Sequence, residues 1–290
     1  MIVAIFGNTL RPTVLSVIQL IADFFSDKEV DLLLDKDLHD FHLTNNEGGI
    51  LNTGVINDDN FTADLVLSIG GDGTFLTTAA RVGAKNIPIL GINLGRLGFL
   101  ADVDSDELDH ALHAILDNKL SIEHHTVLKV ECSDGREIPY PYALNDVSIL
   151  KSDGSSMMGI NTYLNGEAVN TYHADGLIIA TPTGSTAYSM SVGGPIVAIQ
   201  SSSILLSPVA SHGLTVRPLV VPDSWIIDMQ IDTRSGCFQV SLDGRSMVLD
   251  QGVGIRVTKG EHCILVAKQQ NHTFFDTLKS KLMWGLDNRN

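Results

Sequence analysis

Apolar positions in the first hundred residues follow two spacings. Continuous apolar runs bounded by glycine or polar residues predict buried strands, and the stretches between them repeat apolar residues every three or four positions, which predicts helices. The predicted strands cover residues 2–6, 30–34, 65–69 and 87–92. The predicted helices cover residues 13–25, 75–82 and 105–118, the last with Ser105 or Asp106 as N-cap. Strands that alternate with helices indicate parallel crossover connections, and therefore an α/β domain.

The pattern changes after about residue 120. Apolar and polar residues alternate over 128–132 and over 238–242, which is typical of strands with one buried face. Four pairs favour hairpin turns: Asp134-Gly135, Asp153-Gly154, Asn165-Gly166 and Asp243-Gly244. Helical spacing returns over 273–284. We therefore expect an α/β domain over 1–120, a mainly antiparallel β domain over 121–265, and a C-terminal segment over 266–290 whose helix docks on the β domain or returns to the first domain.

Composition narrows the class of protein. Among 290 residues, 19 Lys and Arg stand against 34 Asp and Glu, a net charge of −15. Such an acidic chain is a poor candidate for binding duplex DNA or an anionic membrane, so we expect neither partner. The three cysteines are far apart with no C-x-x-C pair, which argues against a disulfide framework or a cysteine zinc site and fits the cytoplasm. No apolar run reaches the roughly 18 residues of a membrane span, and the N-terminus reads as a buried strand rather than a signal peptide.

The segment Gly70-Gly71-Asp72-Gly73-Thr74 is the first candidate for chemistry. It follows a predicted buried strand and precedes a predicted helix. Its glycines would let the backbone approach a bulky ligand, and the helix N-terminus would offer N–H groups to phosphate. A carboxylate at the end of a strand can accept a hydroxyl proton or help to hold magnesium. A plain glycine turn with a capping aspartate is the alternative. The chain has neither a P-loop nor a G-x-G-x-x-G after its first strand.

A second glycine-rich turn, from Gly91 to Gly98, would line the same crevice. Arg96 within it would either meet a phosphate or be an exposed loop cation. Farther along, residues 181–191 are crowded with hydroxyl groups after a predicted strand. Such a loop can bind sugar hydroxyls and phosphates, and Tyr188 can stack on a base. A hydroxyl-rich turn without a ligand is the alternative; the length and glycine content of the segment favour ligand binding.

Two further features carry less weight on their own. Asn145-Asp146 is a polar pair in an otherwise apolar strand, where polar residues often simply face solvent. The histidines come without a zincin pattern, so we read them as surface residues and predict no metal site on the protein.

These segments, in this order and spacing, resemble the bacterial NAD kinases. The resemblance rests on Gly70 to Thr74, on Asn145-Asp146 and on the long stretch 175–196, DGLIIATPTGSTAYSMSVGGPI, and it covers most of the chain. It implies transfer of the terminal phosphoryl group of ATP, or of polyphosphate, to the adenosine 2′-hydroxyl of NAD. It also implies magnesium or another divalent cation with ATP, and a dimer or tetramer in which a neighbouring subunit completes the NAD site.

The resemblance assigns roles residue by residue. Asp72 matches the proposed proton acceptor, with Gly73 beside it at the ligand. Asn145 and Asp146 match an Asn-Glu pair, so Asp146 would reach one methylene less far, and His173 stands where relatives often carry a basic residue. The expected NAD contacts are Asn145, Asp146, His173, Asp175, Thr183, Thr186, Ala187, Tyr188, Ser189, Met190, Ser191, Ala210 and Arg245. Two other readings stay open: a diacylglycerol-kinase-like lipid kinase, which shares GGDGT, and an NAD(P)-binding sensor without turnover.

Overall fold

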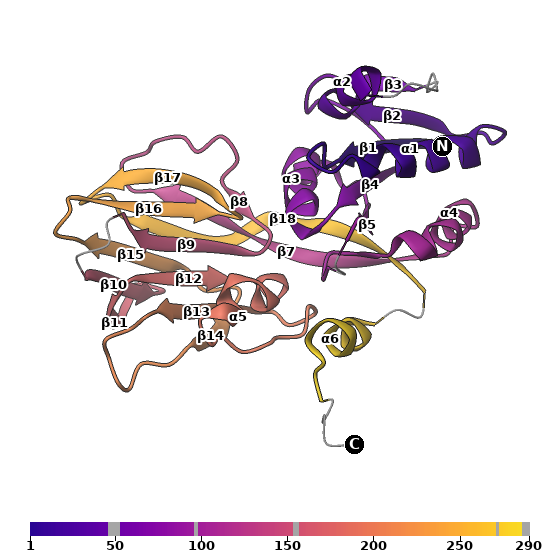
Figure 1. The fold of residues 1–290 in the computed structure, drawn as a ribbon. Helices are drawn as coiled ribbons and strands as arrows, with labels where there is room; N and C mark the ends of the chain where they lie inside the picture. The colour runs from indigo at the N-terminus through magenta and orange to yellow at the C-terminus, as the bar shows by residue number, and fades with distance from the viewer. Residues whose placement is uncertain (46–52, 96–97, 153–156, 271–272, 286–290) are drawn as a thin grey trace. The chain divides into compact units, whose positions relative to one another are not determined.

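A computed structural model describes residues 1–45, 53–95, 98–152, 157–270 and 273–285 (Figure 1). The chain divides into two compact units. Unit 1 comprises Met1–His124 and Ile264–Asn290, and unit 2 comprises His125–Cys263. Two long strands, β7 (Leu120–Cys132) and β18 (Ile255–Gln269), carry the chain from one unit into the other.

Unit 1 is built on a parallel sheet with the strand order β5-β4-β1-β2-β3. Its strands are β1 (Ile2–Gly7), β2 (Asp31–Asp35), β3 (Gly54–Ile56), β4 (Leu65–Gly70), β5 (Ile89–Asn93) and β6 (Ala101–Val103). Its helices are α1 (Thr13–Phe25), α2 (Lys36–Asn45), α3 (Asp72–Val82), α4 (Leu108–Leu116) and α6 (Phe274–Leu282). The core packs the apolar faces of α1 and α4 against β1, β4 and β5, as the helical spacing of their apolar residues requires.

Unit 2 contains two antiparallel sheets. One has the order β14-β13-β12-β9-β16-β17, and in the other β11-β10-β15 continues to β18, which also pairs with β7. These strands are β8 (Tyr142–Ala143), β9 (Asp146–Lys151), β10 (Met158–Leu164), β11 (Glu167–Ala174), β12 (Gly176–Ala180), β13 (Ser203–Val209), β14 (Leu219–Pro222), β15 (Ile227–Asp232), β16 (Cys237–Leu242) and β17 (Arg245–Asp250). The short helix α5 (Tyr188–Ser191) follows a 3₁₀ turn over Thr183–Thr186. One apolar core draws side chains from both sheets, so the sheets pack face to face.

The predicted fold class, an α/β N-terminal part and a mainly antiparallel β part, is confirmed. Helix α1 has the predicted bounds, and the pairs Asn165-Gly166 and Asp243-Gly244 form the predicted hairpin turns with positive φ at both residues. Asp153-Gly154 lies outside the described residues. No described helix is long and apolar enough to cross a membrane.

The predicted start of α4 is wrong. Residues 105–107 form a 3₁₀ turn, and the α-helix begins at Leu108 with Glu107 as N-cap. A 3₁₀ turn often precedes an α-helix, and it places the acidic residues before the first α-helical turn instead of at its cap. Helix α2 and the short strands β3 and β6 were not predicted, because α2 has weak amphipathic spacing and three-residue strands carry almost no periodic signal.

Candidate functional site

Asp72 is the first residue of α3, and only Gly71 separates it from the fully buried strand β4. Its carboxylate accepts three backbone N–H groups from the segment that leads into β6. The donors are Phe99 at 3.0 Å, Leu100 at 3.0 Å and Ala101 at 3.1 Å. The ammonium group of Lys281, from α6, lies 3.3 Å from the Asp72 Oδ2. Backbone N–H groups and a cation therefore both hold this carboxylate, and Phe99 and Lys281 contact the same oxygen.

These contacts decide the charge of Asp72. Burial alone would raise the pKa of this carboxyl group, but the hydrogen bond from Ala101, the charge of Lys281 and the remaining two N–H groups outweigh it. The pKa of Asp72 is consequently below its ordinary value. Asp72 is ionised at neutral pH, as a residue that accepts or orients a hydroxyl proton must be.

The backbone near Asp72 is tightly packed at Gly98 and has free space beside it at Gly71 and Gly73. A Cβ added at Gly98 would lie 2.0 Å from Asp72 Oδ1, so the close approach of this segment requires glycine there. A Cβ added at Gly71 or at Gly73 would meet no described atom within 4 Å. The backbone at the start of α3 thus has open space beside it, where the predicted nucleotide phosphates would lie. Arg96, from the predicted second turn, is outside the described residues.

A buried ion pair helps to hold the segment whose backbone N–H groups donate to Asp72. Lys268 Nζ lies 2.7 Å from Asp102 Oδ2, and Lys268 and Asp102 are 7% and 5% exposed. The same ammonium group donates to the carbonyl of Phe99 at 3.3 Å. Lys268 therefore helps to hold the backbone that binds the Asp72 carboxylate.

Asn145 and Asp146 lie at the start of β9 in unit 2, and both are buried, with exposed fractions of 9% and 8%. This contradicts the solvent-facing alternative for the pair. The Asn145 Oδ1 is buried and accepts no hydrogen bond from the described residues. Because a buried polar atom without a partner costs free energy, this oxygen has hydrogen-bonding capacity that the described residues do not fill.

Asp146 has an unusual ionisation. Burial raises the pKa of its carboxyl group to about 7, and the negative charge of Asp243 contributes to the rise. The Asp146 carboxylate receives no hydrogen bond from the described part of the chain that would offset this. Asp146 is therefore poised between its neutral and charged forms near neutrality, a property that is concentrated at functional sites.

The hydroxyl-rich segment after β12 packs directly on Asn145. A Cβ added at Gly184 would lie 2.0 Å from the Asn145 carbonyl oxygen, so only glycine fits there. Thr181 bridges the two segments, because its hydroxyl donates to the Leu144 carbonyl at 2.6 Å and accepts the Gly184 N–H at 3.1 Å. The structure thereby brings the predicted loop and the predicted Asn145-Asp146 pair together.

Hydroxyl groups in this segment divide into two sets. Besides Thr181, three are buried and hydrogen-bonded within the protein: Thr183 Oγ1 lies 2.9 Å from His125 Nδ1, Ser189 Oγ lies 2.8 Å from Ser207 Oγ, and Ser185 donates to the Pro182 carbonyl at 2.6 Å. These hydroxyls set the shape of the segment. The second set comprises the residues of the segment that are half-buried or exposed, with or without a hydroxyl: Thr186, Ala187, Tyr188, Met190 and Ser191. Tyr188 is 38% exposed. The second set is the part of the segment that is accessible to a ligand.

His173, Asp175 and Ala210 gather at one end of β12 and β13. The Asp175 N–H donates to the Val209 carbonyl at 3.0 Å, directly before Ala210, which has a φ of 47°. The Asp175 carboxylate pairs with Lys151 Nζ at 2.7 Å, and His173 is exposed. A ligand that contacts Asp175 would have to share it with Lys151.

Arg245 is bound to the protein itself. Its guanidinium group donates to the carbonyl oxygens of Tyr140, at 2.9 Å, and Tyr142, and it lies 4.9 Å from the centre of the Tyr140 ring. These contacts give Arg245 a structural role beside Asp243, and its predicted contact with NAD stays a prediction.

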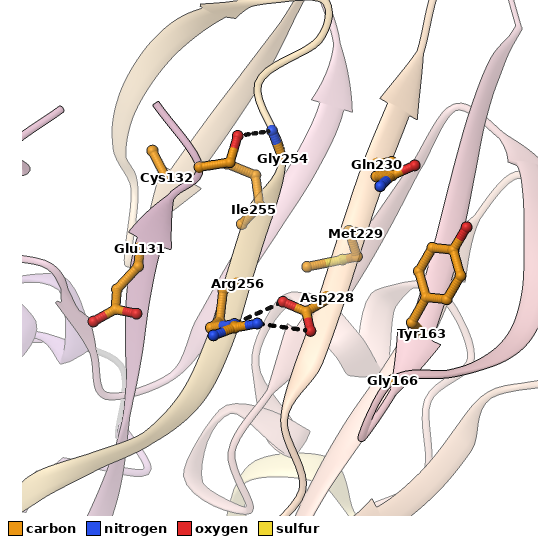
Figure 2. Close-up of a pocket in the computed structure, with 11 residues that line it drawn as sticks. Glu131, Cys132, Tyr163, Gly166, Asp228, Met229, Gln230, Gly254, Ile255 and Arg256 are labelled. Carbon is orange, nitrogen blue, oxygen red and sulfur yellow. Dashed lines mark hydrogen bonds and ion pairs between the residues drawn. The ribbon is translucent and has the colours of Figure 1, made fainter. Parts of the chain in front are cut away.

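The pocket in Figure 2 is separate from these residues. It has a volume of about 530 Å³ and is lined by residues of β7, β10, β15 and β18, together with Gly166. Arg256 and Asp228 face each other across neighbouring strands there and form a two-pronged ion pair at 2.7 and 3.2 Å. None of the described residues that line it is a predicted NAD contact, so this pocket does not mark the predicted site.

Two residues near the site were not predicted from the sequence. Asp243 was interpreted only as half of a hairpin turn, although its carboxylate binds the backbone of residues 144–146. Lys281 was part of the C-terminal helix without a role. Neither carries a sequence signal, since each acts through contacts with residues about a hundred or more positions away. Within the described ranges, no three Asp, Glu, His or Cys side chains gather to hold a metal ion.

Known families and proteins match this chain over most of its length. The family model described as the ATP-NAD kinase N-terminal domain matches residues 3–120, and that of the ATP-NAD kinase C-terminal domain matches residues 144–268. The NAD kinase of Bacteroides fragilis is 45% identical over 286 residues, which are 99% of each chain. The NAD kinase of Cytophaga hutchinsonii is 36% identical over an alignment of 292 positions that covers 100% of each chain.

Solved structures share the fold. Yeast NADH kinase complexed with NADH superposes with a TM-score of 0.91 at 23% identity, over 100% of this chain and 89% of that one. An NAD kinase from Archaeoglobus fulgidus in complex with ATP gives a TM-score of 0.75 at 24% identity, over 98% and 99% of the two chains. Since the two family models span most of the sequence and the relatives align over almost its whole length, the chain belongs to the ATP-NAD kinase family.

Proposed function

We propose that this protein transfers the terminal phosphoryl group of ATP to the adenosine 2′-hydroxyl of NAD and so forms NADP. Membership of the family makes the chain a kinase that acts on NAD. The observation that carries the proposal for the site is the buried Asn145-Asp146 pair, whose side chains keep unfilled hydrogen-bonding capacity. Ribose hydroxyls and the amino groups of a dinucleotide are donors of the kind that such acceptors bind.

NAD would lie along the start of β9 and the segment after β12. Asn145 and Asp146 would accept hydroxyl or amino donors, and the exposed ring of Tyr188 would stack on a base. Thr186, Ala187, Met190 and Ser191 would contact the rest of the dinucleotide, and the bonded hydroxyls of Thr183 and Ser189 would hold the segment in shape. His173, Asp175, Ala210 and Arg245 remain proposed contacts, Asp175 and Ala210 with a neighbouring subunit's ligand.

Asp72 would act on the hydroxyl that attacks the phosphorus. A ribose hydroxyl is a weak nucleophile, so an ionised carboxylate that orients it and takes its proton lowers the barrier. Phosphoryl transfer otherwise depends mainly on positioning and on neutralising charge. Gly73, with open space beside its backbone, would lie against the ligand.

Magnesium or another divalent cation would arrive with the ATP. The described residues offer no cluster of three ligating side chains, and the one carboxylate at the start of α3 is already bound by three N–H groups and Lys281. With a single, already bonded carboxylate, these residues fit a cation that phosphate oxygens and water would mainly coordinate. When bound, the cation would neutralise charge on the triphosphate.

The proposed assembly is a homo-oligomer, a dimer or tetramer, in the cytoplasm. Exposed apolar side chains in unit 2, among them Trp225 at 36% and Val248 at 63%, are candidates for burial between subunits. Light scattering coupled to size-exclusion chromatography, with activity measured during dilution, tests this. A fully active species of one chain would overturn both the oligomer and the shared NAD site.

The activity is tested directly with purified protein, ATP and magnesium. NAD in one series and diacylglycerol in a parallel series distinguish the proposed reaction from lipid phosphorylation. We expect NADP to form, with no phosphatidate. NAD binding without NADP formation under any donor would instead show a non-catalytic sensor, and no NAD binding at all would refute the proposed site as well.

A further inference from the structure

The turn between β16 and β17 bears a carboxylate that reaches back to β9. Asp243 and Gly244 have φ values of 48° and 83°, the conformation of a two-residue hairpin turn, and aspartate is among the few residues with a side chain that tolerate it. The Asp243 carboxylate accepts the backbone N–H groups of Leu144 at 2.6 Å, Asn145 at 2.8 Å and Asp146 at 3.1 Å. Three consecutive N–H groups thus converge on one side chain.

The same short segment is held from its other side. The Leu144 carbonyl accepts the Thr181 hydroxyl at 2.6 Å, and the Asn145 carbonyl accepts the Thr181 N–H at 2.9 Å. The Asp146 carbonyl accepts the N–H of Asp243 at 3.1 Å. Every backbone hydrogen-bonding group of residues 144–146 is therefore engaged, while the Asn145 Oδ1 keeps no partner among the described residues.

We propose that Asp243 is a positioning residue for the proposed reaction, whose carboxylate fixes the backbone of residues 144–146 and so aims the side chains of Asn145 and Asp146 at NAD. The inference rests on the proposed NAD site. Asp243 itself does not contact NAD in this proposal. Its hydrogen bonds to the backbone are charge-assisted, which makes them shorter and stronger than neutral ones.

The charge of Asp243 gives the proposal a second consequence. Asp243 faces Asp146, and Arg245 and the Tyr140 hydroxyl are the other titratable groups that act on Asp243 from neighbouring segments. Its negative charge helps to raise the pKa of Asp146 to about 7, after burial. A ligand hydroxyl that donates to Asp146 favours the ionised carboxylate, so NAD should bind more weakly as pH falls below about 7. Removing the charge of Asp243 should shift that loss to lower pH.

Two variants of Asp243 test its contacts with the backbone of residues 144–146 without changing the conformation of the turn. Asp243→Gly keeps the positive φ and removes all three acceptor contacts, and Asp243→Asn keeps the shape of the side chain and removes its charge. Asn165→Gly is the matched control, because Asn165-Gly166 has the same turn with φ of 49° and 82°, and the Asn165 Oδ1 also accepts a backbone N–H, from Ile226 at 2.9 Å. NAD dissociation constants are measured by calorimetry without ATP, between pH 6 and pH 8, because NAD itself does not titrate there.

We expect Asp243→Gly to weaken NAD binding at pH 8 by about tenfold or more, since hydrogen bonds to a charged group are the costly ones to lose, and Asn165→Gly to leave it within about twofold. Asp243→Asn should weaken binding less and flatten its dependence on pH. If circular dichroism shows that Asp243→Gly is unfolded, the pH dependence of NAD binding by Asp243→Asn alone tests the proposal. Unchanged affinity in folded Asp243→Gly, or an unchanged pH dependence in Asp243→Asn, would overturn the proposal. Failure of the wild type to bind NAD would instead refute the proposed function.

Discussion

Two half-buried carboxylates, Asp72 in unit 1 and Asp243 in unit 2, accept nearly the same hydrogen bonds, yet their pKa values are shifted in opposite directions. Each accepts three backbone N–H groups. The pKa of Asp72 lies below its ordinary value, whereas burial raises the pKa of Asp243 in spite of its donors and of Arg245. Asp72 has a lysine ammonium group 3.3 Å away, and Asp243 has another carboxylate, Asp146, as its neighbour. Backbone donors alone therefore do not decide the direction of the pKa shift: burial outweighs them at Asp243, whereas at Asp72 the donors and the charge of Lys281 outweigh burial.

The difference suits the two roles that we propose. Asp72 is kept ionised, as a proton acceptor at the start of α3 requires. Asp146 titrates near neutrality because it is buried beside Asp243, so its charge can respond to ligand and to pH. One unit would supply a permanent charge for chemistry and the other an adjustable acceptor for binding.

The largest expected effect comes from removing the charge of Asp72. Asp72→Asn should lower turnover by ~10²–10⁴, the usual cost of losing a general base. NAD affinity should stay within a few-fold, because Asp72 belongs to unit 1 and the proposed NAD contacts, apart from Gly73, belong to unit 2. Steady-state kinetics and NAD calorimetry measure the two quantities.

Asp37→Asn is the matched control for Asp72→Asn. Asp37 is an exposed aspartate in the first turn of α2, in the same unit, so the control changes the charge at a helix start without touching the site. Turnover near the wild-type value in folded Asp72→Asn would remove Asp72 from the chemistry and leave its three N–H contacts as purely structural.

The second prediction concerns Asp146 and the stability of unit 2. A carboxyl group with a pKa of about 7 in the folded state and about 3.9 when unfolded binds its proton more tightly in the folded state. The free energy of unfolding should therefore fall as pH rises from about 4 to about 7, and stay lower above that. Asp146→Asn cannot ionise, so at pH 8 it should be more stable than the wild type by on the order of 1–3 kcal/mol, a gain that shrinks toward pH 5.

The two tryptophans allow this measurement in one unit at a time. Trp225 lies in unit 2 and Trp284 in unit 1, so in a Trp284→Phe background fluorescence during urea denaturation follows unit 2. Asp250→Asn, which changes an exposed aspartate of β17, is the control. Equal stabilities of Asp146→Asn and wild type at pH 8 would mean that folding does not raise the pKa of Asp146.

The sequence predicted the parts of this picture that depend on local pattern. Helix α1, the strands before Asp72 and the hairpin turn at Asp243 follow from apolar spacing and from glycine, and the Asn145-Asp146 pair was found by its resemblance to a family motif. Asn145 and Asp146 looked like weak candidates from the strand pattern alone, because alternation does not show that both faces of β9 are covered. Their burial depends on distant parts of the chain: β12 pairs with β9 at Asp146, and the segment after β12 packs on Asn145 at Gly184.

The ionisation of the site could not be predicted in this way. The pKa of Asp72 depends on N–H groups 27 to 29 positions away and on a lysine 209 positions away. The pKa of Asp146 depends on Asp243, 97 positions away. Local sequence does not show such pairs. In sequence, the buried, hydrogen-bonded hydroxyls of Thr183 and Ser189 also look the same as the exposed hydroxyl of Ser191.

The smallest expected effect tests the cation that distinguishes Asp72 from Asp243. Lys281 is held beside Asp72 by α6, whose capping box joins Thr273 and Asp276 and whose Leu278 is 2% exposed. The Lys281 ammonium group also lies 4.5 Å from the centre of the Phe99 ring. Because Lys281 is partly exposed and solvent screens its charge, Lys281→Met should change kcat at neutral pH by less than about fivefold.

The direction of its pH effect is nevertheless definite. Lys281 lowers the pKa of Asp72, so its removal raises that pKa, and a larger share of Asp72 is protonated on the acid side. The acid limb of the kcat profile should therefore move to higher pH in Lys281→Met. Lys279→Met is the control, since Lys279 is exposed and lies about 200° away around the same helix. If the acid limbs of the two variants coincide, Lys281 does not set the charge of Asp72, and burial rather than a neighbouring cation must account for its difference from Asp243.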